Sequence, residues 1–195
     1  MTTQEQFLSK RQRYQPLSLP HDFSDEEMTR DWTLSDMDKE EISNYRKIFR
    51  LHIAIQICAV RLYGRFLNQV HDLSPQIVNY LGQQLNLPPS LVVQTPEREA
   101  TYLEQRQNVL KHLGFQRFDE LSQKHLELWL EQKARLGLLP DELFQQAEHH
   151  LLDQRILLPG PSVLERLIIH ICSTVHQQLF ESVSEQLSPE LRFCH

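Results

Sequence analysis

Five basic side chains that fall close together are the first residues in this sequence whose types and spacing suggest chemistry. They occur within positions 46–71, a segment without Asp or Glu, although the formal net charge of the chain is -6. Binding to nucleic-acid phosphates requires several cations on one surface, because together they displace condensed counterions. The five candidates are Arg46, Lys47, Arg50, Arg61 and Arg65.

A helix over this segment would position the basic residues. At about 100° per residue from Arg46, Arg50 lies at about 40°, Arg61 at about 60° and Lys47 at about 100°. These residues would then share one side of the helix, and the apolar positions would form a buried stripe of Leu51, Ala54, Ile55, Cys58 and Leu62. Two interpretations remain open: a phosphate-binding face, or a solvated face whose Arg stems lie along the core.

The acidic residues favour the first interpretation because they are concentrated elsewhere. Nine Asp and Glu lie between positions 22 and 41, where only Arg30 and Lys39 oppose them. Such segregation allows a net-acidic protein to present a basic surface.

The bulk composition predicts an all-α protein. Only 5 of the 195 residues are Gly, which is few for a fold rich in tight β-turns. No apolar run approaches the roughly 18 residues of a membrane helix, and the N-terminus lacks the apolar core of a secretory signal. We therefore expect a cytoplasmic protein with no membrane contact. Three cysteines without a CxxC pair suggest neither a disulfide framework nor a zinc site.

Local start and stop signals divide the chain into helices. Ser35 and the pair Ser74-Pro75 are typical helix starts, and Gly64 and Gly114 are typical helix ends. These signals predict helices over about 36–45, 46–64, 75–85, 99–113, 121–136, 141–156 and 162–187. Three prolines in the segment NLPPSLVVQTPERE mark a boundary near residue 95, which gives two small helical subdomains, 1–95 and 96–195.

Two helices of the second subdomain are expected to bury an apolar face. One of them has Leu121, His125, Leu128 and Trp129 on one side. The last helix carries a sustained apolar stripe of Leu164, Leu167, Ile168, Ile171, Val175, Leu179 and Val183.

The sequence contains no motif for catalysis or cofactor binding. The ten histidines form no HExxH, and GxxxxGK[ST], GxGxxG and GxSxG are all missing. Cys58 lies in an apolar run, where a buried thiol is usually inert. The residues therefore predict no cofactor, no metal site and no enzyme activity.

The segment WTLSDMDKEEISNYRKIFRLHIAIQICAVRLYGRFL resembles the opening signature of the large replicative transposases of the Tn-three transposon family. Thr33-Leu34-Ser35 matches its first element, and later elements fall within 54–58 and 61–64. LGFQRF at 113–118 and RILLPGPSVLERLI at 155–168 are similar to two further motifs of that family, in the same order. The likeness spans about residues 30–190.

The resemblance implies an N-terminal DNA-binding module of two helix-turn-helix-like subdomains that recognises terminal inverted repeats on double-stranded DNA. The acidic triad that cuts DNA in that family lies in a separate ribonuclease-H-like domain, so this chain would bind DNA without being an enzyme. The first subdomain would use the five basic residues named above. The second would add Arg98, Arg106, Lys111 and Arg117.

The basic N-terminal residues leave two interpretations open. Lys10, Arg11 and Arg13 would form either an arm in the minor groove or a solvated terminus.

A second hypothesis for the whole chain is a helical protein-interaction module, or a decayed transposase fragment that regulates transposition by pairing with itself or with full-length transposase. It rests on the net charge of -6 and on the apolar last helix. A salt series separates the two hypotheses, because phosphate contacts make binding steeply salt dependent whereas a protein interface responds weakly.

Overall fold

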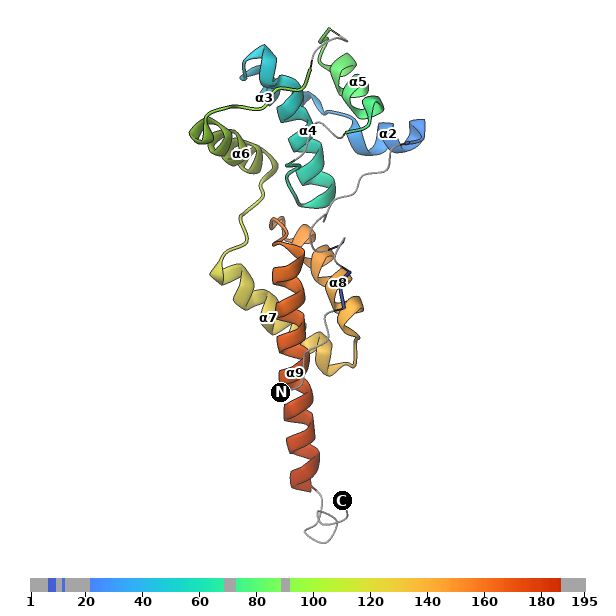
Figure 1. Cartoon of the computed structure of the whole chain (residues 1–195), viewed down its shortest axis with the longest axis vertical. Coiled ribbons are helices and arrows are strands. Elements are labelled where there is room, and N and C mark those ends of the chain that lie inside the picture. Colours follow the sequence, from blue (N-terminus) through green and yellow to red (C-terminus); the bar gives the residue numbers. More distant parts are fainter. Residues whose placement is uncertain (1–6, 10–11, 13–21, 69–72, 89–91, 187–195) are drawn as a thin grey trace. The chain divides into compact units, whose positions relative to one another are not determined.

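The computed structural model describes residues 7–9, 12, 22–68, 73–88 and 92–186. Within these residues the structure is built of helices, and its only β-type pairing is an isolated bridge between Gln116 and Ile156 (Figure 1). The predicted all-α class is confirmed. The helices are α2 (Asp25–Trp32), α3 (Asp36–Ser43), α4 (Lys47–Tyr63), α5 (Pro75–Gln84), α6 (Glu99–Leu113), α7 (Glu120–Arg135), α8 (Pro140–Asp153) and α9 (Pro161–Gln186).

The chain forms two compact units. The N-terminal unit contains α2 to α6 and takes back the short segment Arg155–Leu157. The C-terminal unit contains α7, α8 and α9 together with residues 7–9. After α6 the chain passes into the C-terminal unit at Phe118, so the boundary expected near residue 95 falls inside the N-terminal unit. The division into two functional subdomains stays a prediction.

Most helix ends follow the local signals in the sequence. The Ser35 side chain accepts a hydrogen bond from the Asp38 amide, and the Asp38 carboxylate accepts one from the Ser35 amide. This reciprocal pair is a capping box at the start of α3. Gly64 and Gly114 end α4 and α6 in the left-handed conformation, with φ values of 59° and 69°. The predicted helix ends at these glycines are confirmed.

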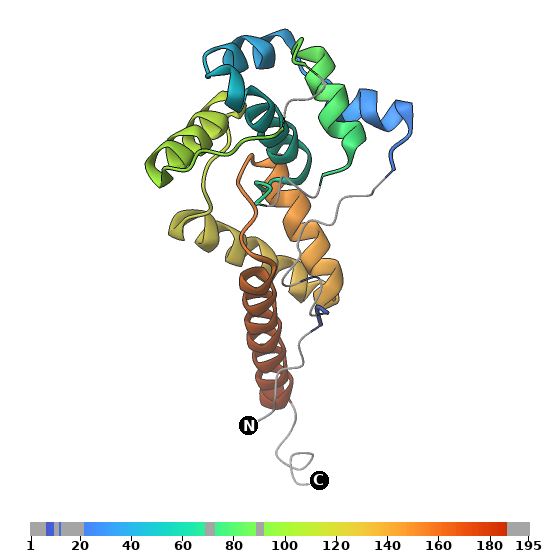
Figure 2. The same ribbon diagram turned by 45° about the horizontal axis from the view of Figure 1, so that its top comes forward.

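Helix α4 is the central helix of the N-terminal unit, and it packs against α2, α3, α5 and α6 (Figures 1 and 2). All ten residues from Leu51 to Val60 are buried. Four of the five expected stripe residues therefore lie in a segment that is buried on all sides, and Leu62 is half-buried. No basic face runs along this segment. The basic residues of this segment lie at the two ends of α4 instead.

Gln56 turns the chain back after α4 has ended. Its side-chain amide donates to the Leu67 carbonyl at 2.8 Å, and its carbonyl oxygen accepts from the Leu67 amide at 2.9 Å. Both residues are buried, so each polar group depends on the other for a partner. The clamp holds the segment that contains Arg65 and Phe66 against α4.

In the C-terminal unit α9 packs against α7 and α8. Leu164, Ile168, Ile171 and Val175 are buried, but Leu179 and Val183 are exposed, so the expected stripe is covered only as far as Val175. Figure 1 shows why: α9 extends beyond α7 and α8, and nothing among the described residues covers its last turns.

The predicted face of α7 is wrong. Ser122, Leu126 and Leu130 point into the unit, whereas Leu121 and Leu128 are exposed. Leucines occur on two different faces of this helix, so their spacing alone does not decide which face is buried. The packing partners α8 and α9 decide it.

Replacing Gln56 by Leu should lower the free energy of unfolding by about 3 kcal/mol, because the amide and carbonyl of Leu67 are then buried without a partner. Chemical denaturation at neutral pH measures the change. Gln83→Leu, at an exposed position of α5, is the matched control and should change stability little. Equal effects of the two substitutions would contradict the importance of the clamp.

Candidate nucleic-acid interface

The nine cations predicted to bind DNA all lie in the N-terminal unit. The structure divides them into two groups. Four are held by the protein's own groups: Arg50, Arg61, Arg65 and Arg106. Five are exposed and make no side-chain hydrogen bond or ion pair with other described residues: Arg46, Lys47, Arg98, Lys111 and Arg117.

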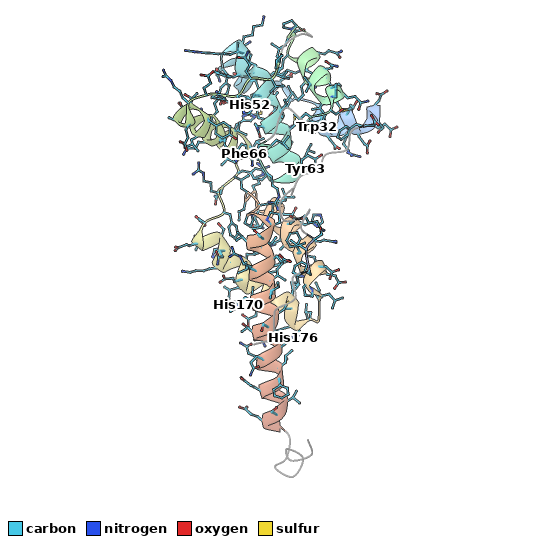
Figure 3. All side chains as sticks on the ribbon, in the orientation of Figure 1. Trp32, His52, Tyr63, Phe66, His170 and His176 are labelled. Atoms are coloured by element: carbon cyan, nitrogen blue, oxygen red, sulfur yellow. The ribbon has the colours of Figure 1, made fainter. Side chains whose placement is uncertain are left out.

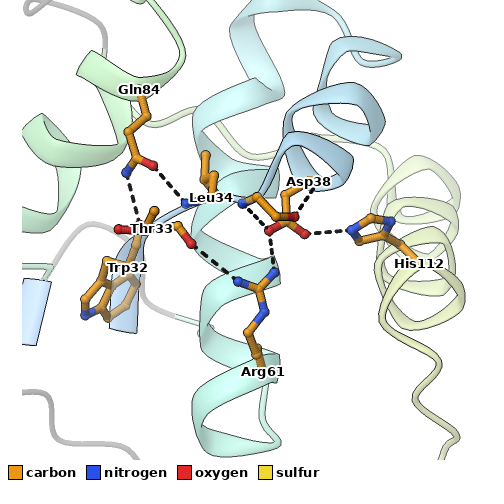
Figure 4. A network of polar contacts seen from close by, with 8 residues as sticks. Trp32, Thr33, Leu34, Asp38, Arg61, Gln84 and His112 are labelled. Atoms are coloured by element: carbon orange, nitrogen blue, oxygen red, sulfur yellow. Dashed lines mark hydrogen bonds and ion pairs between the residues drawn. The ribbon is translucent and has the colours of Figure 1, made fainter. Parts of the chain in front are cut away.

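Arg61 belongs to a network around a buried carboxylate (Figure 4). Its Nη2 atom lies 2.5 Å from the Oδ2 atom of Asp38, and its Nη1 atom donates to the Thr33 carbonyl. On the other side, the Nε2 atom of His112 lies 2.7 Å from Asp38 Oδ1. Asp38 is only 2% exposed. One carboxylate therefore joins α3, α4 and α6.

The pKa of Asp38 reports the balance in this network. Burial alone would raise it, but hydrogen bonds from His112, Arg61 and the Ser35 backbone outweigh burial and hold the pKa below its usual value. The sequence indicated only the capping role of Asp38, because Arg61 and His112 are 23 and 74 residues away along the chain.

The other three held arginines also act within the unit. Arg50 donates to the carbonyls of Ser43 and Tyr45 and so satisfies the end of α3. Arg65 is buried. The guanidinium of Arg106 lies 4.1 Å from the centre of the Phe66 ring, a cation–π contact.

Three of the five unengaged cations line one groove, with a volume of about 1090 Å³. Arg46 and Arg98 are the N-cap residues of α4 and α6, and neither helix start has a side-chain cap. The free amides and positive dipole ends of two helices therefore accompany Arg46, Arg98 and Lys111. Lys47 and Arg117 are exposed outside the groove lining.

The groove also carries side chains that suit contacts with base edges. Gln105 is 6% exposed, and its Oε1 atom has no partner among the described residues. Gln105 therefore belongs to the floor of the groove. Exposed amide groups pair with the donor and acceptor edges of bases, whereas cations position the phosphates. The groove lining carries three carboxylates as well as three cations, so it has no net positive charge from these groups. Binding of DNA here would therefore depend on individual hydrogen bonds and ion pairs. The remaining amides are Asn44, Gln94 and Asn108, and the carboxylates are Glu41, Glu97 and Glu104.

Groups that could serve catalysis are dispersed or buried. Burial raises the pKa of the Cys58 thiol to about 12, and burial with Arg106 lowers the pKa of His52 to about 4. Figure 3 places His52 on α4 and His170 and His176 on α9. Within the described residues, no three potential metal ligands converge.

Two further sequence predictions concern the termini and membranes. Lys10, Arg11 and Arg13 lie outside the described residues. No helix in the described part of the chain is long and apolar enough to cross a membrane.

Residues 7–171 match a family model described as "Domain of unknown function (DUF4158)". The chain belongs to this family. It is also 26% identical over 170 residues to the "Transposase for transposon gamma-delta" of Escherichia coli, an alignment that covers 83% of this chain. The "Transposase for transposon Tn501" of Pseudomonas aeruginosa is 27% identical over 95% of the chain, and the "Transposase for transposon Tn1546" of Enterococcus faecium is 24% identical over 82%.

These relatives are much longer proteins. The matched regions make up 16% of the gamma-delta and Tn1546 transposases and 19% of the Tn501 transposase. The resemblance to the large replicative transposases is thus confirmed, and this DUF4158 chain spans less than one fifth of the length of the relatives it matches.

Replacing Asp38 by Asn should lower the free energy of unfolding at pH 7 by about 2–4 kcal/mol, because a buried ion pair loses one partner. The pKa of Asp38 is lower in the folded than in the unfolded state. The stability that its carboxylate contributes is therefore fully present above the unfolded pKa, and it is lost as the pH falls through the folded pKa. Chemical denaturation at pH 7 and at strongly acidic pH measures the change. The free energies of unfolding of the wild type and the variant should become nearly equal at strongly acidic pH.

The control for this prediction is Asp36→Asn on the same helix. Asp36 is fully exposed and lies 3.7 Å from Lys39, so its removal should change stability little. If the free energies of unfolding of the wild type and Asp38→Asn differ by the same amount from pH 7 down to strongly acidic pH, the lowered pKa of Asp38 is contradicted.

Proposed function

We propose that the N-terminal unit binds double-stranded DNA at the terminal inverted repeats of a transposon, as the DNA-binding region of a replicative transposase. The proposal includes helix-turn-helix-like docking and a chain that catalyses nothing by itself. The relatives are named as transposases, and this supports the proposal because a transposase acts on DNA. The observation that carries it is the groove lined by Arg46, Arg98 and Lys111.

The division of the cations decides which of them we assign to DNA. A guanidinium that already satisfies a buried carboxylate or a helix end is not available to a phosphate without breaking that contact. We therefore assign phosphate contacts to Arg46, Lys47, Arg98, Lys111 and Arg117. The remaining four cations stabilise the fold of the N-terminal unit by their internal contacts: Arg50, Arg61, Arg65 and Arg106.

The test is a titration of labelled inverted-repeat duplex, from the flanks of the source element, against a scrambled duplex at several salt concentrations. The wild type should prefer the inverted repeat, with a steep salt dependence. Arg46→Ala combined with Arg98→Ala should reduce the salt slope by about 2, because two phosphate contacts are lost. Stability should be unchanged, since neither side chain has a partner among the described residues.

The matched control removes two cations elsewhere. Both residues are exposed: Arg30 pairs with the neighbouring Asp31, and Arg135 pairs with Glu131 and also donates to the Gln178 side chain. Arg30→Ala with Arg135→Ala therefore changes the net charge equally, outside the groove lining. This control should leave the salt slope unchanged. Equal, feeble binding of both duplexes by the wild type would overturn the proposal. An equal reduction of the salt slope in both double variants would overturn the assignment of the phosphate contacts to the groove.

The second candidate function, a protein-interaction module, is favoured by one observation. In the C-terminal unit the described residues include eleven Asp and Glu but only four Lys and Arg, whereas the N-terminal unit has twelve of each. An acidic unit with exposed apolar side chains suits a protein partner better than a polyanion. The two candidate functions thus belong to different units and do not exclude one another.

A further inference from the structure

A groove between α7 and α9 is the most prominent unassigned feature of the C-terminal unit. It has a volume of about 450 Å³. Its apolar part consists of Leu128 on α7 and of Ile171 and Val175 on α9. Leu128 is 61% exposed, so this large apolar side chain stands at the edge of the groove without a covering partner among the described residues.

Carboxylates dominate the charged part of this lining. Glu127 and Glu131 lie on α7, and Lys124 is the one Lys or Arg among the described lining residues. Glu127 accepts a hydrogen bond from Gln123, and Glu131 pairs with Arg135 at an exposed position where such a pair contributes little. His170 and Thr174 complete the polar lining.

Further apolar side chains are exposed beyond the groove. Leu179, Phe180 and Val183 are exposed on the last turns of α9, which extend past α7 (Figure 1). Leu179 lies one helical turn after Val175, so part of this exposed apolar area adjoins the groove along α9. Exposed apolar area beyond single scattered side chains marks binding surfaces.

We propose that this groove binds an amphipathic α-helix of a partner protein, with apolar residues on one face and Lys or Arg along its edges. The apolar face of that helix lies on the exposed Leu128, above a groove floor of the buried Ile171 and Val175, and its basic edge faces Glu127 and Glu131. The mode is a helix in a groove between two helices.

Charge selects this occupant over the alternatives. The described residues of the unit have a formal net charge of -7, so DNA is repelled, and a second copy of the unit brings the same charge to the contact. A basic amphipathic helix combines attraction to the carboxylates with burial of the exposed leucine.

The experiment uses the whole chain and two synthetic helical peptides of about 18 residues with the same leucine pattern, one with Lys and one with Glu at the polar positions. Anisotropy of the labelled peptides measures binding. The Lys peptide should bind at least about tenfold more tightly than the Glu peptide. Leu128→Gln should weaken binding of the Lys peptide about tenfold, because one buried leucine is lost.

Leu121 provides a closely matched control. It is a leucine on the same helix, it is 62% exposed, and it does not line the groove. Leu121→Gln should bind the Lys peptide as the wild type does. Both leucines are exposed, so neither substitution should unfold the protein.

Three outcomes would overturn the proposal: equal binding of the two peptides, equal effects of the two leucine substitutions, or self-association in sedimentation that Leu128→Gln abolishes. The last outcome would identify a second copy as the occupant. None of these measurements involves DNA, so failure here and failure of the DNA titration are independent.

Discussion

The compensation of one buried carboxylate determines how the N-terminal unit is assembled. Asp38 is excluded from water, and an ionised carboxylate in that position is tolerated only when cations and donors surround it. Its partners come from the start of α3, the end of α4 and the last turn of α6. By joining these three helices the network also sets the relation between the starts of α4 and α6, where Arg46 and Arg98 line the groove.

The sequence predicted the features that depend on neighbouring residues. Caps and left-handed glycines act within a few residues, so the ends of α4 and α6 and the starts of α3 and α5 could be predicted from Gly64, Gly114, Ser35 and Ser74. The partners of the arginines could not. Arg61 meets Asp38 across 23 residues, and a helical projection contains no information about such a contact. For the same reason the buried phase of α7 required knowledge of α8 and α9.

The net charge of the chain conceals a division between its units. The described N-terminal residues are balanced, and the acidic excess lies in the C-terminal unit. A chain with net charge -6 can therefore contain one unit compatible with a polyanion and another that repels it. The proposed DNA binding thus belongs to the N-terminal unit, and the acidic excess of the C-terminal unit does not oppose it.

The motifs that carry the family resemblance mostly hold the fold together. The Thr33 carbonyl accepts from Arg61, the Leu34 amide donates to Gln84, and Ser35 caps α3 (Figure 4). In the two later motifs, Gly114 ends α6, and Arg155 donates to the Leu113 carbonyl at that same end.

A sequence likeness built on such residues indicates a shared fold, because these contacts hold the helices together whatever the unit binds. Recognition of a particular DNA sequence depends instead on exposed side chains that the fold does not constrain. Arg46, Arg98 and the exposed groove amides Asn44, Gln94 and Asn108 are the side chains proposed for that role, and most of them lie outside the motifs that carry the likeness. Membership of the family therefore predicts the scaffold of this protein better than it predicts the sequence that the scaffold would recognise.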